Sequence, residues 1–191
     1  MDLGPCHVDV GKMASTLIER SIKDEAEIKH YVNEQCAKVI GVATPPLAAP
    51  QDIVLFGFGR IGRLLARLLI EKTGGGTQLR LRAIVVRRSG ANDIAKRAGL
   101  LRRDSVHGSF QGTLRVDEEN ECIIANGNVI RVIYAEGPDK VDYTSYGIDN
   151  AIIIDNTGAW SDEEGLSQHL KSKGASRVIL TAPGKGSIKN I

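Results

Sequence analysis

The sequence predicts an α/β protein with a doubly wound, mostly parallel sheet, and three observations support this prediction. Short apolar runs rich in β-branched residues recur along the chain, as expected of strands buried on both faces of a parallel sheet. Segments with helical periodicity separate these runs, which favours repeated βα units. A glycine-rich turn joins the first run to the first such helix at residues 57–62. We therefore expect a ligand crevice at the carboxyl ends of the strands.

Composition excludes several classes of protein. The 191-residue chain is 42% hydrophobic, enough for a substantial core, and its formal net charge of +2 gives no reason to expect a nucleic-acid partner. No stretch approaches the roughly 18 consecutive apolar residues of a membrane span, and the N-terminus lacks the apolar core of a signal peptide. The three cysteines share no metal-binding spacing and are expected to be reduced thiols. The prediction is a soluble, cytoplasmic protein without a metal site or a membrane partner.

Residues 1–50 are predicted to be a helical extension that precedes the main domain. Asp9 and Asp24 are suitable N-caps, and apolar positions follow each of them at helical spacing. The proline-rich segment 44–50 excludes a helix and predicts a linker or extended strap. The extension is interpreted as a packing or oligomer-stabilising helix pair, with a dedicated partner-binding module as the alternative.

The first βα unit carries the main functional signal. An apolar run at residues 53–56 leads into Gly57-x-Gly59-x-x-Gly62. The first glycine permits a sharp turn, the second lets a pyrophosphate approach the backbone, and the third lets the helix pack closely on the strand. The N-terminus of the helix then presents free N–H groups and the positive end of the helix dipole to an anion. The helix is predicted to bury a stripe formed by Ile61, Leu64, Leu65, Leu68 and Leu69, with Arg60, Arg63, Arg67 and Glu71 outside.

The second strand, residues 79–86, should end where a dinucleotide fold places an acid that binds the adenosine ribose. No acid stands there; Val86 is followed by Arg87 and Arg88. Guanidinium groups bind phosphate through charge-assisted hydrogen bonds, so this position favours or at least permits the 2′-phosphate of NADP. The alternative is that both arginines belong to an ordinary solvated basic loop.

The remaining segments complete the predicted sheet. A helix is expected at residues 92–101, and an antiparallel hairpin at residues 113–133, with Asn126-Gly127 as a type I′ turn. Cys122 lies inside this hairpin and is interpreted as a small buried hydrophobe. Parallel strands follow at residues 151–154 and 177–181, and Asp162 begins a helix between them. His107 and His169 are interpreted as loop-fixing hydrogen-bond partners and not as catalytic bases.

The motifs together resemble the glyceraldehyde-3-phosphate dehydrogenase family over almost all of residues 51–191. Five stretches occur in the order of that family, namely Gly57-Phe-Gly-Arg-Ile-Gly-Arg63, Arg103-Asp-Ser-Val-His-Gly108, Ala125-Asn-Gly-Asn128, Asn156-Thr-Gly158 and Leu180-Thr-Ala-Pro183. The resemblance is greatest to longer bacterial members with an N-terminal extension. It implies a Rossmann domain over residues 51–191 that binds NADP or NAD, and a homo-oligomeric parent protein.

The resemblance also assigns site residues. It implies that the pyrophosphate meets Gly57, Gly59 and Gly62 and the backbone amides of Arg60 and Ile61, with Phe58 inside the same turn. It places Thr157 and Gly158 beside the cofactor, Trp160 near the adenine, and Thr181 near the same crevice. Val86 stands at the position of the ribose-binding acid, beside Arg87, which puts the usual NAD preference of the family in question.

The family's catalytic elements do not occur in this sequence. Its members attack the aldehyde with the cysteine of a Ser-Cys-Thr-Thr-Asn motif, assisted by a later histidine, and neither element is present. The chain is therefore expected to be the cofactor domain of a phosphorylating aldehyde dehydrogenase without the catalytic domain. The alternatives are a stand-alone nucleotide-binding or assembly module, and the cofactor domain of an erythrose-4-phosphate dehydrogenase.

Overall fold

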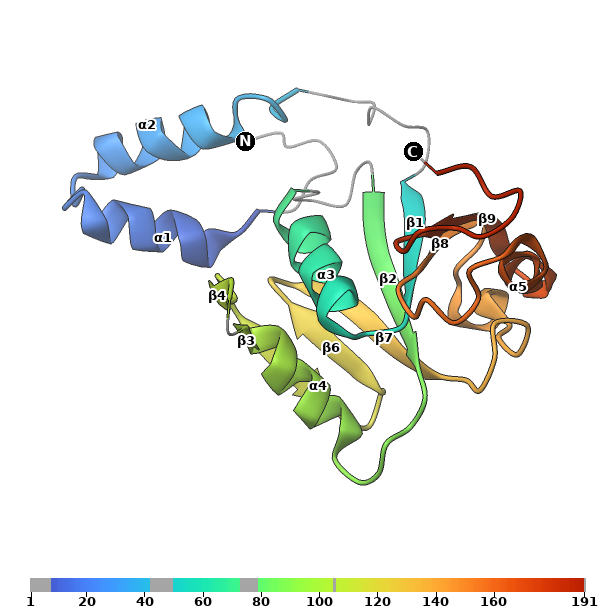
Figure 1. Ribbon diagram of the computed structural model, residues 1–191. Coiled ribbons are helices and arrows are strands. Elements are labelled where there is room, and N and C mark those ends of the chain that lie inside the picture. Colours follow the sequence, from blue (N-terminus) through green and yellow to red (C-terminus); the bar gives the residue numbers. More distant parts are fainter. Residues whose placement is uncertain (1–7, 42–49, 73–78, 105, 191) are drawn as a thin grey trace.

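Figure 1 shows the computed structural model of the chain, which describes residues 8–41, 50–72, 79–104 and 106–190. Its centre is a seven-stranded sheet in the order β5-β6-β7-β2-β1-β8-β9. The five parallel strands are β1 (Gln51–Phe56), β2 (Leu79–Val86), β7 (Asn128–Tyr134), β8 (Ala151–Asp155) and β9 (Ala175–Leu180). The antiparallel strands β5 (Leu114–Asp117) and β6 (Cys122–Ala125) extend one edge. The predicted doubly wound sheet with an inserted hairpin is confirmed.

Two hydrophobic cores lie on opposite faces of this sheet because side chains alternate along each strand. Leu55 of β1 points into the first core, where α3 (Arg60–Lys72) and α4 (Asp93–Arg102) cover the sheet. Val54 points into the second core, beside the short 3₁₀ helix η1 (Tyr143–Tyr146). The connection from β8 to β9 contains α5 (Glu163–Ser167) and the 3₁₀ helix η2 (Gln168–Lys171). Figure 1 shows α3 and α5 on either side of the carboxyl end of β1.

The predicted buried stripe of α3 is confirmed only in part. Leu65 and Leu69 pack against the first core, but Ile61 and Leu68 are 48% and 49% exposed, and Ala66 and Ile70 are in the core instead. The cause is Gly62, because a Cβ at this position would lie 2.5 Å from the carbonyl oxygen of Gly57. The helix therefore turns its smallest residue toward the strand, and the positions four and eight residues later follow it into the core.

Arg67 also departs from the prediction of a purely outer face. Its side chain is half-buried, and Nε and Nη2 donate to the carbonyl oxygen of Leu101 at 3.0 and 2.6 Å. Nη1 donates to the carbonyl oxygen of Gly108 at 2.9 Å. This arginine joins α3 to the end of α4 and to the small ribbon of β3 (Arg103–Asp104) and β4 (Gly108–Ser109).

The hairpin and its neighbours agree with their sequence patterns. Asn126 and Gly127 both have positive φ, 48° and 80°, as a type I′ turn requires. Cys122 is 3% exposed, and burial raises the pKa of its thiol, which agrees with its interpretation as a small hydrophobe. Nδ1 of His107 lies 3.0 Å from Oδ1 of Asp104, the loop-fixing contact expected for this histidine.

The N-terminal extension contains two helices that project away from the sheet in Figure 1, α1 (Val10–Glu19) and α2 (Glu25–Cys36). The carboxylates of Asp9 and Asp24 accept hydrogen bonds from first-turn amides, so both predicted N-caps are confirmed. Tyr31 and Cys36 of α2 are buried, and the guanidinium of Arg20 lies over the Tyr31 ring, with Cζ 5.6 Å from the ring centroid. Residues 44–49 of the predicted linker, and Cys6, lie outside the described residues. Within the described ranges, no helix has the length and apolar character needed to cross a membrane.

Candidate functional site

The glycine turn follows directly from β1, and each glycine has its own environment. Gly57 has a φ of 90°, and a Cβ there would lie 2.7 Å from Cγ2 of Thr157. Gly62 is constrained by its contact with the Gly57 carbonyl described above. A Cβ on Gly59 would meet no atom within 4 Å. Packing therefore accounts for the first and third glycines, while the second faces open space in which a phosphate group can approach the backbone.

The start of α3 closes this turn. The amide of Arg63 donates to the carbonyl oxygen of Gly59 at 3.0 Å. The amides that precede it belong to the first turn of the helix and have no acceptor within the helix. The ring of Phe58 is 7% exposed and packs in the first core, so this residue offers only its backbone. Among the described residues, Nε of Arg63 and Oδ1 of Asn156 are buried without a hydrogen-bond partner. The free amides and open space at this turn fit the pyrophosphate of a dinucleotide.

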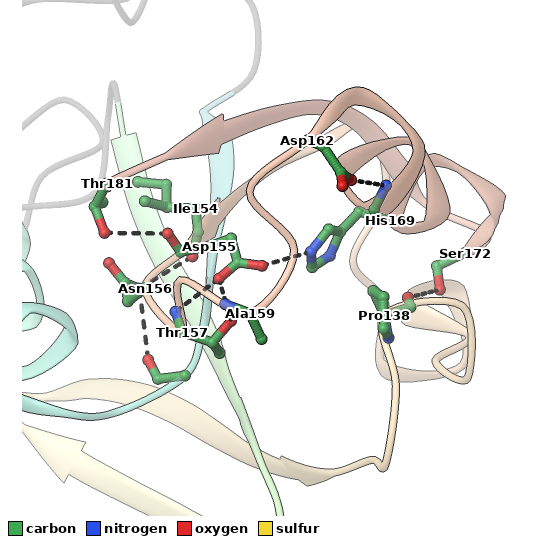
Figure 2. A network of polar contacts seen from close by, with 12 residues as sticks. Pro138, Ile154, Asp155, Asn156, Thr157, Ala159, Asp162, His169, Ser172 and Thr181 are labelled. Carbon is green, nitrogen blue, oxygen red and sulfur yellow. Dashed lines mark hydrogen bonds and ion pairs between the residues drawn. The ribbon is translucent and has the colours of Figure 1, made fainter. Parts of the chain in front are cut away.

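A second loop meets the turn from the end of β8, where Asp155 pairs in register with Phe56 of β1. Figure 2 shows the Asp155 carboxylate between Thr157 and the ring of His169. Oδ1 accepts hydrogen bonds from the amide and hydroxyl of Thr157 at 2.6 and 2.7 Å. Nδ2 of Asn156 donates to the carbonyl oxygen of Ile154 at 3.0 Å and lies 3.5 Å from that of Gly57. The loop is thus fixed by the carboxylate and lies against the glycine turn.

Asp155 and His169 form a buried pair beneath this loop. Both residues are 0% exposed, and Nε2 of His169 lies 2.9 Å from Oδ2 of Asp155. Burial raises the pKa of Asp155, but hydrogen bonds from His169 and Thr157 outweigh it and hold the pKa below its ordinary value. The carboxylate is therefore ionised in the folded protein. This contact agrees with the interpretation of His169 as a loop-fixing hydrogen-bond partner. Its partner Asp155 was not anticipated, although an acid that ends an otherwise apolar strand was a visible signal.

Three further predicted site residues surround the same loop. Thr181 donates its amide and hydroxyl to the carbonyl oxygen of Asp155 at 3.0 and 3.1 Å. A Cβ on Gly158 would lie 3.9 Å from Cβ of Ala182, so the loops after β8 and β9 touch. Trp160 packs edge to face on Phe56, with ring centroids 5.6 Å apart, and lies against the second core. The structure thus brings Thr157 against the turn, joins Gly158 and Thr181 to the neighbouring loops after β8 and β9, and packs the Trp160 indole on Phe56, the residue before the turn.

The two arginines lie on the other side of the turn, after β2. Arg88 stacks on Tyr134, with Cζ 3.8 Å from the ring centroid, and its Nη2 lies 2.5 Å from Oε1 of Glu121. Nε of Arg87 lies 3.7 Å from Oε2 of Glu136. Both arginines are exposed, so a ligand phosphate can reach them. The two glutamates were not anticipated, because they come from distant segments of the chain.

The candidate site has three parts, and each follows the carboxyl end of one of three adjacent strands. The arginines follow β2, the glycine turn follows β1, and the Thr157 loop follows β8. Neighbouring strands are about 5 Å apart, so an extended ligand can span all three. The arrangement can bind an elongated anionic molecule across the point where the strand order reverses. Cys36 and Cys122, the two cysteines in the described ranges, are buried and lie in other elements.

Comparisons with known proteins identify this arrangement. Residues 51–163 match the family model described as glyceraldehyde 3-phosphate dehydrogenase, NAD binding domain. A glyceraldehyde-3-phosphate dehydrogenase-like protein of Pseudomonas aeruginosa (strain UCBPP-PA14) is 56% identical over all of this chain, which covers 41% of that relative.

Two more distant relatives match less of the chain. A glyceraldehyde-3-phosphate dehydrogenase of Streptococcus pyogenes is 33% identical over 71% of the chain and 37% of the relative. The chloroplastic glyceraldehyde-3-phosphate dehydrogenase GAPB of Arabidopsis thaliana is 33% identical over 87% of the chain and 36% of the relative.

The N-terminal extension is included in the match to the Pseudomonas protein, since that match covers the whole chain. The chain spans only about two fifths of the length of these relatives. The family model covers more than half of the chain, and its match includes the glycine turn, the loop after β8 and every strand of the large sheet except β9. The chain therefore belongs to the glyceraldehyde-3-phosphate dehydrogenase family through its NAD-binding domain, whose cofactor is NAD or NADP.

Proposed function

We propose that residues 51–191 form the cofactor domain and hold the dinucleotide pyrophosphate on the backbone of residues 57–62. The open space at Gly59 carries this proposal, because the other two glycines are explained by packing alone. In this arrangement the amides of Arg60 and Ile61 face the phosphate oxygens. Thr157, Gly158 and Thr181 form the wall of the crevice on the side of β8 and β9, and Trp160 supports that wall from below.

The ends of β2 and β7 would then receive the adenosine ribose. Val86 provides no carboxylate to repel a 2′-phosphate, and Arg87 and Arg88 stand directly after it. Their glutamate partners are exposed, and exposed ion pairs are worth about 0–1 kcal/mol, so a phosphate can compete for both guanidiniums. This supports binding of NADP as well as NAD.

For the parent protein we propose oxidation of glyceraldehyde 3-phosphate to 1,3-bisphosphoglycerate, with NAD(P) as hydride acceptor and phosphate as co-substrate. This chain would supply cofactor binding without turnover. Burial of Cys36 and Cys122, at 4% and 3% exposure, supports this division of labour, because a catalytic thiolate must be accessible. Erythrose 4-phosphate as the substrate has no specific support in this domain.

The outer face of α1 supports a role of residues 1–50 in subunit assembly. It thereby also supports a homo-oligomeric parent protein. Val10 and Ile18 are 69% and 77% exposed, and with Ala14 they form an apolar row at intervals of four residues. Such a row can stabilise contact with another subunit. Sedimentation analysis of the 191-residue chain and of residues 51–191 alone would test this role, and the same number of subunits in both complexes would argue against it.

Titration calorimetry with NAD and NADP tests the cofactor proposal, using Gly59→Ala as the informative variant. A methyl group at Gly59 meets open space, so the thermal unfolding midpoint should stay within about 2 °C of wild type. Cofactor affinity should fall by about tenfold or more, since the methyl group occupies the path of the pyrophosphate.

Gly99→Ala is the matched control, because Gly99 also has open space around its Cβ position but lies in α4. Cofactor affinity of this variant should equal that of wild type. If a folded wild-type chain binds neither cofactor, the proposed function is wrong. If Gly59→Ala and wild type bind equally, the pyrophosphate is not at this turn.

A further inference from the structure

The buried carboxylate of Asp155 lies next to the candidate cofactor site, and the glycine motif does not explain its presence. Asp155 and His169 are fully buried beneath the loop, and their atoms Oδ2 and Nε2 are 2.9 Å apart. An apolar pair in this position could stabilise the fold as well, because the cost of removing the carboxylate from water offsets the attraction of its partner, although removing one partner alone is destabilising. General stability is therefore a poor explanation of this pair, and its contacts point to another one.

The second oxygen of Asp155 controls the conformation of the loop. Oδ1 accepts hydrogen bonds from both the amide and the hydroxyl of Thr157. The oxygen of that hydroxyl in turn accepts a hydrogen bond from the amide of Ala159 at 3.1 Å. The backbone from residue 155 to residue 159 is thus organised around one carboxylate, as Figure 2 shows. Any rotation of this carboxylate would move the loop.

The orientation of the carboxylate depends on His169. The imidazole stands edge to face with Phe56, with ring centroids 4.7 Å apart, and with Trp160, at 6.2 Å. Nδ1 of His169 is buried without a partner in the described part of the chain, so the hydrogen bond to Asp155 is the polar contact of this ring. The aromatic neighbours hold the imidazole in place, and the imidazole holds the carboxylate.

The loop transmits this order to the glycine turn. Cγ2 of Thr157 is the nearest atom to the Cβ position of Gly57, and Phe56, which contacts His169, immediately precedes that glycine. The pair therefore touches both sides of the crevice wall on β1 and β8. We propose that Asp155 and His169 are positioning residues that hold the Thr157–Gly158 loop against the glycine turn in the geometry that binds the dinucleotide. This inference rests on the proposed cofactor function.

The test compares two substitutions of His169 in the 191-residue chain. His169→Leu removes the donor to Asp155, whereas the amide of His169→Gln can donate from nearly the same place. We expect His169→Leu to weaken NAD or NADP binding by about tenfold or more, as loss of a charge-assisted hydrogen bond predicts. His169→Gln should recover most of that loss. Binding is measured by calorimetry at a temperature where circular dichroism shows each variant to be folded.

Tyr143→Phe is the matched control. Tyr143 is also 0% exposed, lies in the same core as Phe56, and has a hydroxyl without a partner among the described residues. Its removal should leave cofactor affinity unchanged.

The outcomes separate this inference from the proposed function. A folded His169→Leu variant with wild-type affinity would show that the pair has only a structural role. Equal losses in the leucine and glutamine variants would also overturn the inference. If His169→Leu does not fold, Thr157→Val removes the hydroxyl but keeps the shape, and unchanged affinity there would reject it. A wild-type chain that binds neither cofactor would instead reject the proposed function.

Discussion

The two strands that flank β1 meet the glycine turn in opposite ways. On the side of β8, a fully buried carboxylate and imidazole fix the loop. On the side of β2, two exposed arginines are held by exposed glutamates. The loop after β8 is already ordered, so ligand binding would not have to pay the entropy of ordering it. The glutamates that pair with the arginines after β2 can instead be replaced by a ligand phosphate. In the proposed cofactor site, the β8 flank would determine whether a dinucleotide binds, and the β2 flank would determine which one.

The largest expected effect comes from breaking the buried flank. Asp155→Ala leaves the buried imidazole of His169 without its partner and removes the acceptor of the Thr157 amide. The free energy of unfolding should fall by about 3–5 kcal/mol, as is typical when one partner of a buried pair is removed. Urea denaturation followed by circular dichroism measures this loss. Asp139→Ala, which removes the exposed pair with Lys140, is the control and should change stability little.

Acid should weaken the same flank. The pKa of Asp155 is lower in the folded chain than its ordinary value near 3.9, so its contribution to stability is complete above about pH 4 and is lost as the pH falls further. Asp155→Asn abolishes this titration. Its free energy of unfolding should therefore fall less steeply than that of wild type below about pH 4. Parallel curves for the two proteins would show that Asp155 does not carry this acid sensitivity.

A smaller and selective effect is expected on the exposed flank. Replacing Arg87 and Arg88 together with alanine should weaken NADP binding by about 1–3 kcal/mol and leave NAD binding nearly unchanged. Parallel calorimetric titrations with the two cofactors measure the difference. Arg115→Ala, on the exposed side of the edge strand β5, controls for the loss of positive charge. Equal weakening of both cofactors would mean that the arginines do not discriminate between them.

The smallest expected effect concerns the glutamate that holds Arg88. Glu121→Gln removes the competing carboxylate, so NADP affinity should rise by about 0.2–1 kcal/mol, the usual range for an exposed ion pair. NAD affinity should stay constant. Glu118→Gln changes an exposed carboxylate in the same turn and separates the direct contact from the general change in charge. A fall in NADP affinity would mean that Glu121 organises Arg88 for the phosphate.

The sequence was a good guide where the signal is local. Strand runs, N-caps at Asp9 and Asp24, and the turn at Asn126 depend on neighbouring residues, and the structure confirms them. Burial of Ile61 and Leu68 in α3 was mispredicted because the contact of Gly62 with the Gly57 carbonyl outweighs hydrophobic periodicity. Contacts such as His169 with Asp155 or Arg88 with Glu121 join residues 14 and 33 positions apart, and only the folded sheet brings them together.

The place of β1 in the sheet also affects how the crevice forms during folding. β1 pairs with β8, and Ile53 and Ile152 are partners in that pairing although about a hundred residues separate them. Closing so long a loop is slow relative to local structure, so the pairing of β1 with β2 should precede the docking of β8. The glycine turn can therefore form early in folding, before the loop after β8 packs against it. That loop depends on the pairing of β1 with β8, the contact of β1 that is most distant in sequence. A folding intermediate without β8 would lack half of the cofactor site.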